Sequence, residues 1–127
     1  MIYFDASALI AIVTARPNAA ELEVFLESHP GRPMVTSTVG LIEAVRNCSR
    51  IGDFPNLMTQ LLHDYDELAL TAEVRDRAAD LPGGLKTLDA IHVATAEMLG
   101  DELVAFVTYD RRMANVARSQ GLPVESP

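Results

Sequence analysis

The sequence predicts an α/β fold, a three-layer α/β/α sandwich with a mostly parallel central sheet, folded as one domain over residues 1–127. Short apolar runs of strand length alternate with longer segments of helical periodicity, which is the element order of parallel sheets covered by helices. A length of 127 residues is close to the common size of one domain. Hydrophobic residues make up 49% of the chain and charged residues 22%, so it can bury one ordinary globular core.

Apolar runs and capping residues define the first elements. Residues 1–4 are mostly apolar, which predicts a short buried strand, and the helix that follows is expected at about 7–14. Asn18 and Glu21 have the spacing of a capping box. A second helix should therefore begin there and end near the His-Pro-Gly sequence at 29–31.

The same order continues through the middle of the chain. Residues 33–36 predict a second strand, and either Ser37 or Thr38 can cap a long helix that stops at Gly52. A further helix, with leucines along one face, is expected to begin with residues 53–55.

The second half begins with a weaker strand signal at residues 67–70. Thr71 is expected to cap a short helix that ends near residue 81, and the Pro-Gly-Gly sequence at 82–84 is the clearest loop in the chain. The apolar helix after this loop is predicted to have Thr87 as its cap.

Three elements complete the predicted fold. Residues 103–108 have the strongest strand signal of the sequence, residues 113–119 predict the last helix, and residues 122–124 form a short terminal strand or arm. In open parallel sheets, ligands bind outside the carboxyl ends of the strands. Acidic residues at those ends are therefore candidates for a functional site.

The net charge of −8 limits the possible functions. Non-specific nucleic-acid binders place Lys and Arg against the phosphates, and this chain is acidic overall, which taken alone argues against a nucleic-acid partner. An acidic excess is compatible with phosphate chemistry where a divalent cation reverses the local charge. Nine of the ten basic residues are Arg, which suits bidentate phosphate contacts and structural ion pairs alike.

The cellular location is predicted to be cytoplasmic. Cys48 is the one cysteine, so neither a disulfide framework nor a thiolate metal site is expected. Its thiol is expected to be part of the packing surface of a helix. The apolar stretch at 8–15 is too short to span a bilayer, lacks a preceding basic region and follows Asp5. We therefore expect no membrane segment and no secretory signal.

Four acidic residues lie where predicted elements meet. Asp5 follows the first strand and Asp110 follows the strand at 103–108, while Glu43 and Asp89 lie near the beginning of helices. In an open parallel sheet these places can share one edge. Carboxylates close together repel one another unless a cation compensates, and hard ions such as Mg²⁺ or Mn²⁺ prefer oxygen ligands. Such a site suits phosphodiester chemistry.

Each acid also has a purely structural interpretation. Asp5 and Asp110 could be turn or N-cap residues, and Asp89 could favour the dipole of its helix. Glu43 could pair with Arg46 or Asn47 on its own helix. Asp89 is harder to explain in this way, because its neighbours 88, 90, 91, 93 and 94 are all apolar and indicate a largely buried helix.

Four fragments, FDASAL, LIEAVR, TLDAIHVATA and FVTYDRRM, occur in an order that resembles the PIN-domain ribonucleases, and more narrowly the VapC toxins of VapBC toxin–antitoxin modules. The resemblance covers essentially the whole chain. It implies a PIN-like fold and a Mg²⁺- or Mn²⁺-dependent endoribonuclease, the toxin of a type II toxin–antitoxin system. Such toxins cleave cellular RNA, with transfer or ribosomal RNA expected, and thereby inhibit translation and growth.

The resemblance also implies roles for individual residues and partners. The metal-binding and catalytic acids would be Asp5, Glu43, Asp89 and Asp110. Polar support would come from Thr108 and Ser7. A VapB-type antitoxin and a homodimer are the expected partners. Many relatives carry a further acid shortly after the fourth one, whereas this chain continues with Arg-Arg-Met, which weakens the case for a second metal ion.

Four arginines are candidates for RNA contact. Arg46 and Arg50 recur at helical spacing from Glu43, and Arg111 and Arg112 directly follow the fourth acid. They could hold phosphates around the acidic centre, although an ion pair between Arg46 and Glu43 is an equally simple interpretation. His92 lies one turn beyond Asp89, either as a packing residue in the core or at the border of the site.

Other functions fit the sequence less well. Haloacid-dehalogenase-type phosphatases need a second Asp two positions after the first, and Ser7 occupies that position. Receiver domains need a Lys after the last strand, and no Lys follows Lys86. A PIN-fold nuclease without a toxin role, or a non-catalytic metal-binding module, stays open as an alternative.

Overall fold

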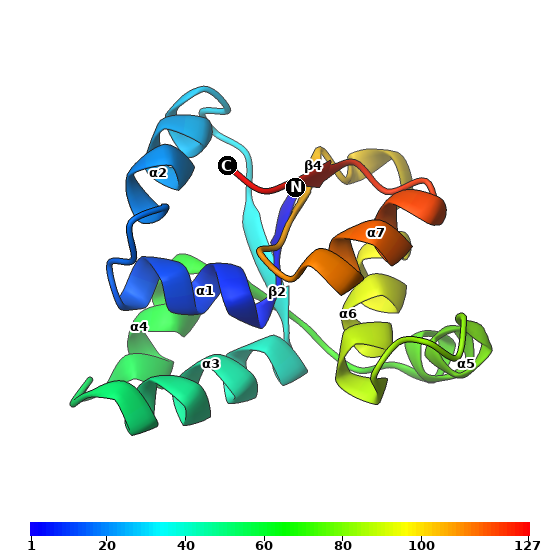
Figure 1. Ribbon diagram of the computed structural model, residues 1–127, viewed down its shortest axis with the longest axis horizontal. Helices are drawn as coiled ribbons and strands as arrows, with labels where there is room; N and C mark the ends of the chain where they lie inside the picture. The colour runs from blue at the N-terminus through cyan, green and yellow to red at the C-terminus, as the bar shows by residue number, and fades with distance from the viewer.

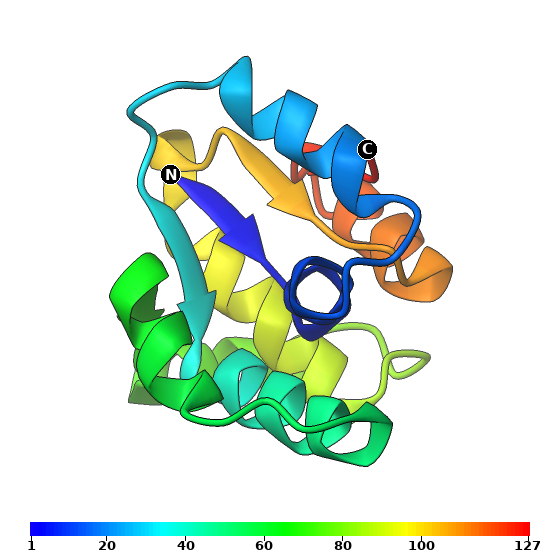
Figure 2. The same ribbon diagram turned by 90° about the vertical axis from the view of Figure 1, so that its left-hand side faces the viewer.

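The computed structural model describes all 127 residues and contains one parallel sheet with the strand order β3-β2-β1-β4-β5 (Figures 1 and 2). The strands are β1 (Ile2–Phe4), β2 (Met34–Ser37), β3 (Asp66–Leu68), β4 (Ala105–Val107) and β5 (Val124–Glu125). Every strand pairing is parallel. The predicted α/β sandwich with a parallel central sheet is therefore confirmed, and the terminal segment is a strand rather than a free arm.

Helices cover both faces of the sheet (Figure 1). On one face lie α1 (Ala6–Val13), α2 (Ala19–Glu27), α3 (Thr38–Ile51) and α4 (Leu57–Asp64). On the other face lie α5 (Ala72–Asp80), α6 (Thr87–Glu97) and α7 (Arg111–Ser119). A short 3₁₀ helix, Gly100–Glu102, leads into β4. No helix is long and apolar enough to cross a bilayer.

Two hydrophobic cores result from this three-layer arrangement. Ile2 and Phe4 point into the core under α1–α4, whereas Tyr3 points into the core under α5–α7. Tyr3 stacks on Phe106 of the neighbouring strand with ring centroids 5.3 Å apart. Both faces of β1 are buried, which explains why this strand is a continuous apolar run rather than an alternating one. Cys48 is buried in the first of the two cores, as its position in α3 predicted.

The parallel register of the strands places the beginnings of several helices at the carboxyl ends of the strands, which form one edge of the sheet. Phe4 lies opposite Val107, so that Asp5 and Thr108 leave the sheet side by side. Helices α1, α3 and α7 begin at this edge, and each is capped by the side chain of the residue before it. These caps are Asp5, Ser37 and Asp110. Their positions explain why α1 begins one residue and α7 two residues earlier than predicted.

Two capping predictions are wrong. Asn18 precedes α2 but has helical backbone angles and makes no side-chain capping bond, because a cap requires extended backbone. Thr87 is the first residue of α6, and Lys86 occupies the capping position without a side-chain bond. By contrast, the predicted cap Thr71 accepts a hydrogen bond from Val74 N. The third strand also begins one residue earlier and ends two residues earlier than predicted.

Candidate active site

The four predicted acids line one cavity of about 240 Å³ at the carboxyl edge of the sheet. Asp5 joins β1 to α1, Glu43 lies in the second turn of α3, Asp89 in the first turn of α6, and Asp110 caps α7. They come from four separate segments, and the parallel topology brings these segments to the same place. The same cavity is also lined by Ala6, Ser7, Ile10, Asn47, His92 and Met113.

Asp5 is the most buried of the four acids, with 1% of its surface exposed. Its Oδ1 accepts hydrogen bonds from Ala8 N at 2.9 Å and Ser7 Oγ at 2.6 Å, and its Oδ2 accepts one from Thr108 Oγ1 at 2.5 Å. Burial nevertheless raises the pKa of Asp5, because these hydrogen bonds only partly replace the lost hydration. Ser7 and Thr108, the two hydroxyl residues singled out from the sequence, thus both contact the Asp5 carboxylate.

The same hydroxyls connect Asp5 to the segment that carries Asp110. Ser7 Oγ accepts a hydrogen bond from Tyr109 N at 2.9 Å, and Thr108 Oγ1 accepts one from Asp110 N at 3.1 Å. The Asp110 Oδ1 atom accepts from the N–H of Met113 at 3.1 Å as the cap of α7. Two of the four acids are therefore held by one continuous hydrogen-bond network between the ends of β1 and β4.

Glu43 has a different partner from those considered in the sequence. Its Oε1 lies 2.8 Å from His92 Nε2, and its side chain forms no ion pair with Arg46. Asn47 donates to the backbone carbonyl of Glu43, not to its carboxylate. His92 is fully buried and also borders the cavity, so both interpretations of this residue hold at once. Its position one turn after Asp89 on α6 was the available signal.

Asp89 is half-buried and accepts no hydrogen bond from the rest of the chain. Burial raises its pKa, and the negative charges of Asp110, Glu43 and Asp5 raise it further, while His92 acts in the opposite direction. The expectation that α6 is buried on most sides fails at its first turn, where Leu88 is 44% exposed. Asp89 still lines the cavity, together with His92 one turn later on the same side of α6.

The donor set suits a hard divalent cation. All four acids offer oxygen ligands, and the pKa of Asp89 is raised by burial first and then by the neighbouring negative charges, whose repulsion a cation would relieve. No three acidic, His or Cys side chains lie close enough together to hold a metal ion as they stand. Hydrogen bonds hold the side chains of Asp5, Glu43 and Asp110 in the orientations that line the cavity.

Two hollows extend from the acidic cavity and contain arginines. Arg46 and Arg50 line a groove of about 380 Å³ that shares Glu43 and Asn47 with the cavity. On the other side, Arg111 lines a hollow of about 440 Å³ that shares Asp110.

None of the four predicted arginines forms an ion pair, and all four are exposed. Arg112 lines neither hollow. Arg118 was not singled out in the sequence, although it lies seven residues after Arg111, on the same side of α7, and lines the same hollow.

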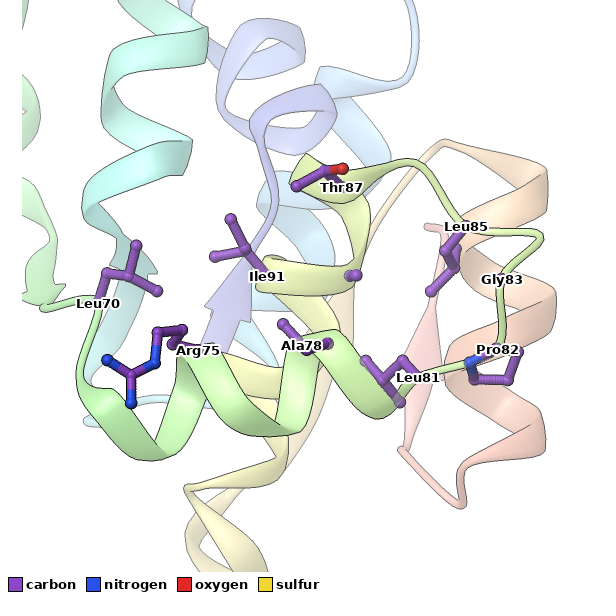
Figure 3. Close-up of a pocket in the computed structure, with 11 residues that line it drawn as sticks. Leu70, Arg75, Ala78, Leu81, Pro82, Gly83, Leu85, Thr87 and Ile91 are labelled. Carbon is purple, nitrogen blue, oxygen red and sulfur yellow. The ribbon is translucent and has the colours of Figure 1, made fainter.

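A third hollow lies between α5 and α6, and none of the four acids lines it (Figure 3). Its lining is mostly apolar, as Leu70, Leu81 and Ile91 illustrate, and it includes none of the predicted site residues. The convergence of acidic side chains distinguishes the cavity at the sheet edge from this apolar hollow, and we take the acidic cavity as the candidate active site.

Comparison with known proteins identifies relatives along the whole chain. A family model described as PIN domain matches residues 2–119. Ribonuclease VapC47 of Mycobacterium tuberculosis (strain CDC 1551 / Oshkosh) is 39% identical, and the match covers 100% of this chain and 97% of that protein. Ribonuclease VapC46 of Mycobacterium tuberculosis (strain ATCC 25618 / H37Rv) is 34% identical, covering 99% and 97% respectively.

Solved structures share the fold at much lower sequence identity. FitAB bound to an IR36 DNA fragment superposes with a TM-score of 0.73 at 16% identity, covering 98% of this chain and 94% of the other. VapBC2 from Rickettsia felis, bound to a DNA fragment from the promoter, gives 0.69 at 15% identity and covers 98% of each chain. The five-stranded parallel sheet and its helices are therefore shared with proteins of very different sequence.

Proposed function

This chain belongs to the PIN domain family and is related along its full length to the VapC ribonucleases, and from this premise we propose that it is a metal-dependent endoribonuclease. The observation that carries the proposal is the convergence of four carboxylates, from four segments of the chain, on one cavity at the carboxyl edge of a parallel sheet. Proteins named ribonuclease at 33–39% identity support the choice of RNA as substrate.

The proposed catalytic residues are Asp5, Glu43, Asp89 and Asp110, which would hold Mg²⁺ or Mn²⁺. The cation supplies positive charge that activates water and offsets the negative charge developing on the phosphoryl oxygens. Ser7 and Thr108 orient the Asp5 carboxylate by donating hydrogen bonds to it. The short hydrophobic strand β1 fixes this carboxylate at the end of a rigid element.

The substrate path would run through the two arginine-lined hollows. Arg46 and Arg50 would contact phosphates on one side of the acids, and Arg111 and Arg118 on the other. Arg112, which is exposed beside the cavity, would contribute only long-range attraction. Single-stranded or looped regions of transfer or ribosomal RNA are the substrates that such an open edge can reach.

The proposed biological role is that of the toxin in a type II toxin–antitoxin system acting in the cytoplasm. The relatives carry VapC names, and one structure of the same fold is a VapBC2 complex. A VapB-type antitoxin is therefore the proposed partner, and a homodimer is the proposed assembly of the chain, which we take as one PIN-like domain.

The test is RNA cleavage by purified protein freed of any antitoxin. With Mg²⁺ or Mn²⁺ we expect site-specific cleavage that EDTA stops. Asp5→Asn should lower the rate by about 100-fold or more, since removing one preorganised group from a catalytic centre typically costs about 10²–10³. Asp101→Asn, at an exposed acid in the 3₁₀ helix, is the matched control and should cleave like the wild type.

Each contrary outcome has a definite meaning. Equal cleavage by the wild type and Asp5→Asn would indicate a contaminating nuclease and overturn the assignment. Binding of Mn²⁺ without cleavage of any RNA would favour a non-catalytic metal-binding module. Cleavage without growth arrest on expression in cells would favour a PIN-fold nuclease that has no toxin role.

A further inference from the structure

A chain of hydrogen bonds reaches Glu43 from inside the hydrophobic core. The hydroxyl of Tyr3, on the central strand β1, lies 2.7 Å from His92 Nδ1 on α6. The other ring nitrogen of His92, Nε2, lies 2.8 Å from Glu43 Oε1 on α3. Tyr3 and His92 are fully buried, whereas Glu43 is half-buried and faces the cavity. Side chains from β1, α6 and α3 thus form one hydrogen-bonded chain that ends at the acidic site.

The direction of both hydrogen bonds follows from the chemistry of the groups. A carboxylate oxygen only accepts, so Nε2 carries the hydrogen that His92 donates to Glu43. In the neutral ring Nδ1 then carries no hydrogen, so it accepts the hydrogen bond that the Tyr3 hydroxyl donates. The Tyr3 hydroxyl in this way fixes both the orientation and the tautomer of the His92 ring.

The space for this ring is provided by a glycine in α3. A Cβ atom added to Gly40 would lie 3.0 Å from His92 Cε1 and 2.5 Å from Thr36 Oγ1. On its other side, the ring packs edge-on against Tyr3, with centroids 5.8 Å apart and an interplanar angle of 78°. His92 can therefore hardly rotate, and no other side chain hydrogen-bonds the Glu43 carboxylate.

We propose that His92 is a positioning residue that holds the Glu43 carboxylate ready to bind the divalent cation, and that Tyr3 in turn holds His92. This inference rests on the proposed metal-dependent function. A residue needed only to fill the core could be apolar and would require no polar partners, whereas His92 has one partner at each nitrogen and one of these lines the cavity. Groups that hydrogen-bond to a metal-ligating side chain and fix its orientation commonly govern the metal affinity of the site.

The experiment measures Mn²⁺ affinity by titration calorimetry, together with kcat at saturating Mn²⁺ and the thermal unfolding midpoint. His92→Leu removes the donor to Glu43 and should weaken Mn²⁺ binding by about 10-fold or more. His92→Gln offers an amide that can donate to Glu43, and it should restore most of the affinity. Tyr3→Phe keeps the aromatic stacking on Phe106 but removes the hydrogen bond to His92 Nδ1, so an intermediate loss is expected.

The matched control is Thr95→Val, at a buried polar residue on the same helix whose hydroxyl donates only to the Ile91 carbonyl. This variant should bind Mn²⁺ with wild-type affinity, whatever its unfolding midpoint. A purely structural role would lower the unfolding midpoint in the His92 variants and leave the Mn²⁺ affinity of the folded protein unchanged. That result would overturn the proposal.

Two further outcomes separate this inference from the proposed function. If the wild type cleaves RNA in an Asp5-dependent way while His92→Leu and Tyr3→Phe keep full Mn²⁺ affinity, the positioning role is wrong and the function stands. A wild type that neither binds Mn²⁺ nor cleaves RNA would overturn both. Should His92→Leu fail to fold, Tyr3→Phe and His92→Gln decide the question: full affinity in Tyr3→Phe, or a 10-fold loss in His92→Gln, would overturn the proposal.

Discussion

The Asp5 carboxylate has two places in the structure, one as a helix cap and one in the lining of the acidic cavity. It caps α1 through Ala8 N and at the same time lines the acidic cavity. Three hydrogen bonds do not fully offset its burial, and its pKa is raised as a result. At neutral pH the ionised form therefore destabilises the folded chain when no cation is bound. A residue that served only as a helix cap would not need this destabilisation, whereas the proposed catalytic role would explain it.

Asp5→Asn should stabilise the protein in the presence of EDTA at pH 7.5, by on the order of 1 kcal/mol, a typical single-site effect. Asn caps helices about as well as Asp, so the change removes mainly the charge. Because the folded pKa is raised, the folded state binds the proton more tightly than the unfolded state. The penalty is absent below the unfolded pKa and grows as the pH rises through the folded pKa.

Urea unfolding at pH 4 and pH 7.5 checks the direction of this pH dependence. The difference in the free energy of unfolding between the variant and the wild type should be small at pH 4 and larger at pH 7.5. Saturating Mn²⁺ should reverse the order, because the cation stabilises only the form that binds it. A wild type that is more stable than Asp5→Asn at pH 7.5 in EDTA would contradict the prediction.

At the scale of single residues, the sequence identified the acids but not all of their partners. Asp5 and Asp110 could be found because each follows an apolar run, which is a local pattern. The contacts of His92 could not be found in the same way. Its partners Tyr3 and Glu43 lie 89 and 49 positions away, and only the packing of β1, α3 and α6 brings them together.

The position of helix α3 depends on how closely its first turn approaches the sheet and α6. Ser37 caps the helix by accepting a hydrogen bond from Gly40 N, and the bare Cα of Gly40 leaves room for Thr36 and His92. One turn later on this helix comes Glu43. The position of a proposed catalytic side chain thus depends on a residue that has no side chain of its own.

Gly40→Ala should therefore destabilise the fold, although Ala is a better helix former than Gly. The added methyl group would overlap Thr36 Oγ1 and press on the His92 ring, and overpacking of this kind costs about 1–3 kcal/mol. Moving α3 away would also displace Glu43, so kcat should fall. Urea unfolding and RNA cleavage measure the two effects.

Gly84→Ala is the matched control, because a Cβ atom there meets nothing within 4 Å. It should change neither the free energy of unfolding nor kcat appreciably. A Gly40→Ala variant as stable and active as the wild type would show that α3 can shift without harm to the site.

At the scale of elements, sequence patterns located the five strands and the seven α-helices but not the short 3₁₀ helix Gly100–Glu102, and the ends of helices were less predictable. The capping pattern at Asn18 has the right spacing but the wrong backbone conformation, because the chain already turns helically before α2. Asp5 and Asp110 act as caps and extend α1 and α7 beyond their predicted beginnings. Capping depends on the backbone angle at one residue, which the tertiary fold determines.

The whole molecule is acidic, yet basic side chains gather where the substrate is proposed to bind. The net charge is −8, while Arg46 and Arg50 flank the cavity on one side and Arg111 and Arg118 on the other. An acidic surface elsewhere would repel RNA and restrict its approach to this edge. The overall charge thus favours selective approach rather than affinity.

Replacing Arg46 and Arg50 together by Ala should raise KM several-fold and leave kcat nearly unchanged, because phosphate contacts position the substrate without taking part in the chemistry. The dependence of log KM on log salt concentration should become shallower by about 0.7 for each lost phosphate contact. Steady-state cleavage of a short RNA at several salt concentrations measures both quantities.

Arg32→Ala provides the control, since Arg32 is exposed just before β2, at the opposite edge of the sheet from the acids. It should keep the wild-type KM and salt dependence. Identical salt dependence in the double variant and the wild type would remove Arg46 and Arg50 from the substrate path.

The central place of β1 in the sheet has a consequence for the synthesis of the protein. Asp5 is made early, but its partner Thr108 lies 103 positions later, and β4 can join β1 only after β2, β3 and the helices between them have been made. A growing chain can therefore pair β1 with β2 well before it can complete the cavity. Assembly of the four acids into one cavity is a late event in folding, because it waits for the segment that carries Thr108 and Asp110.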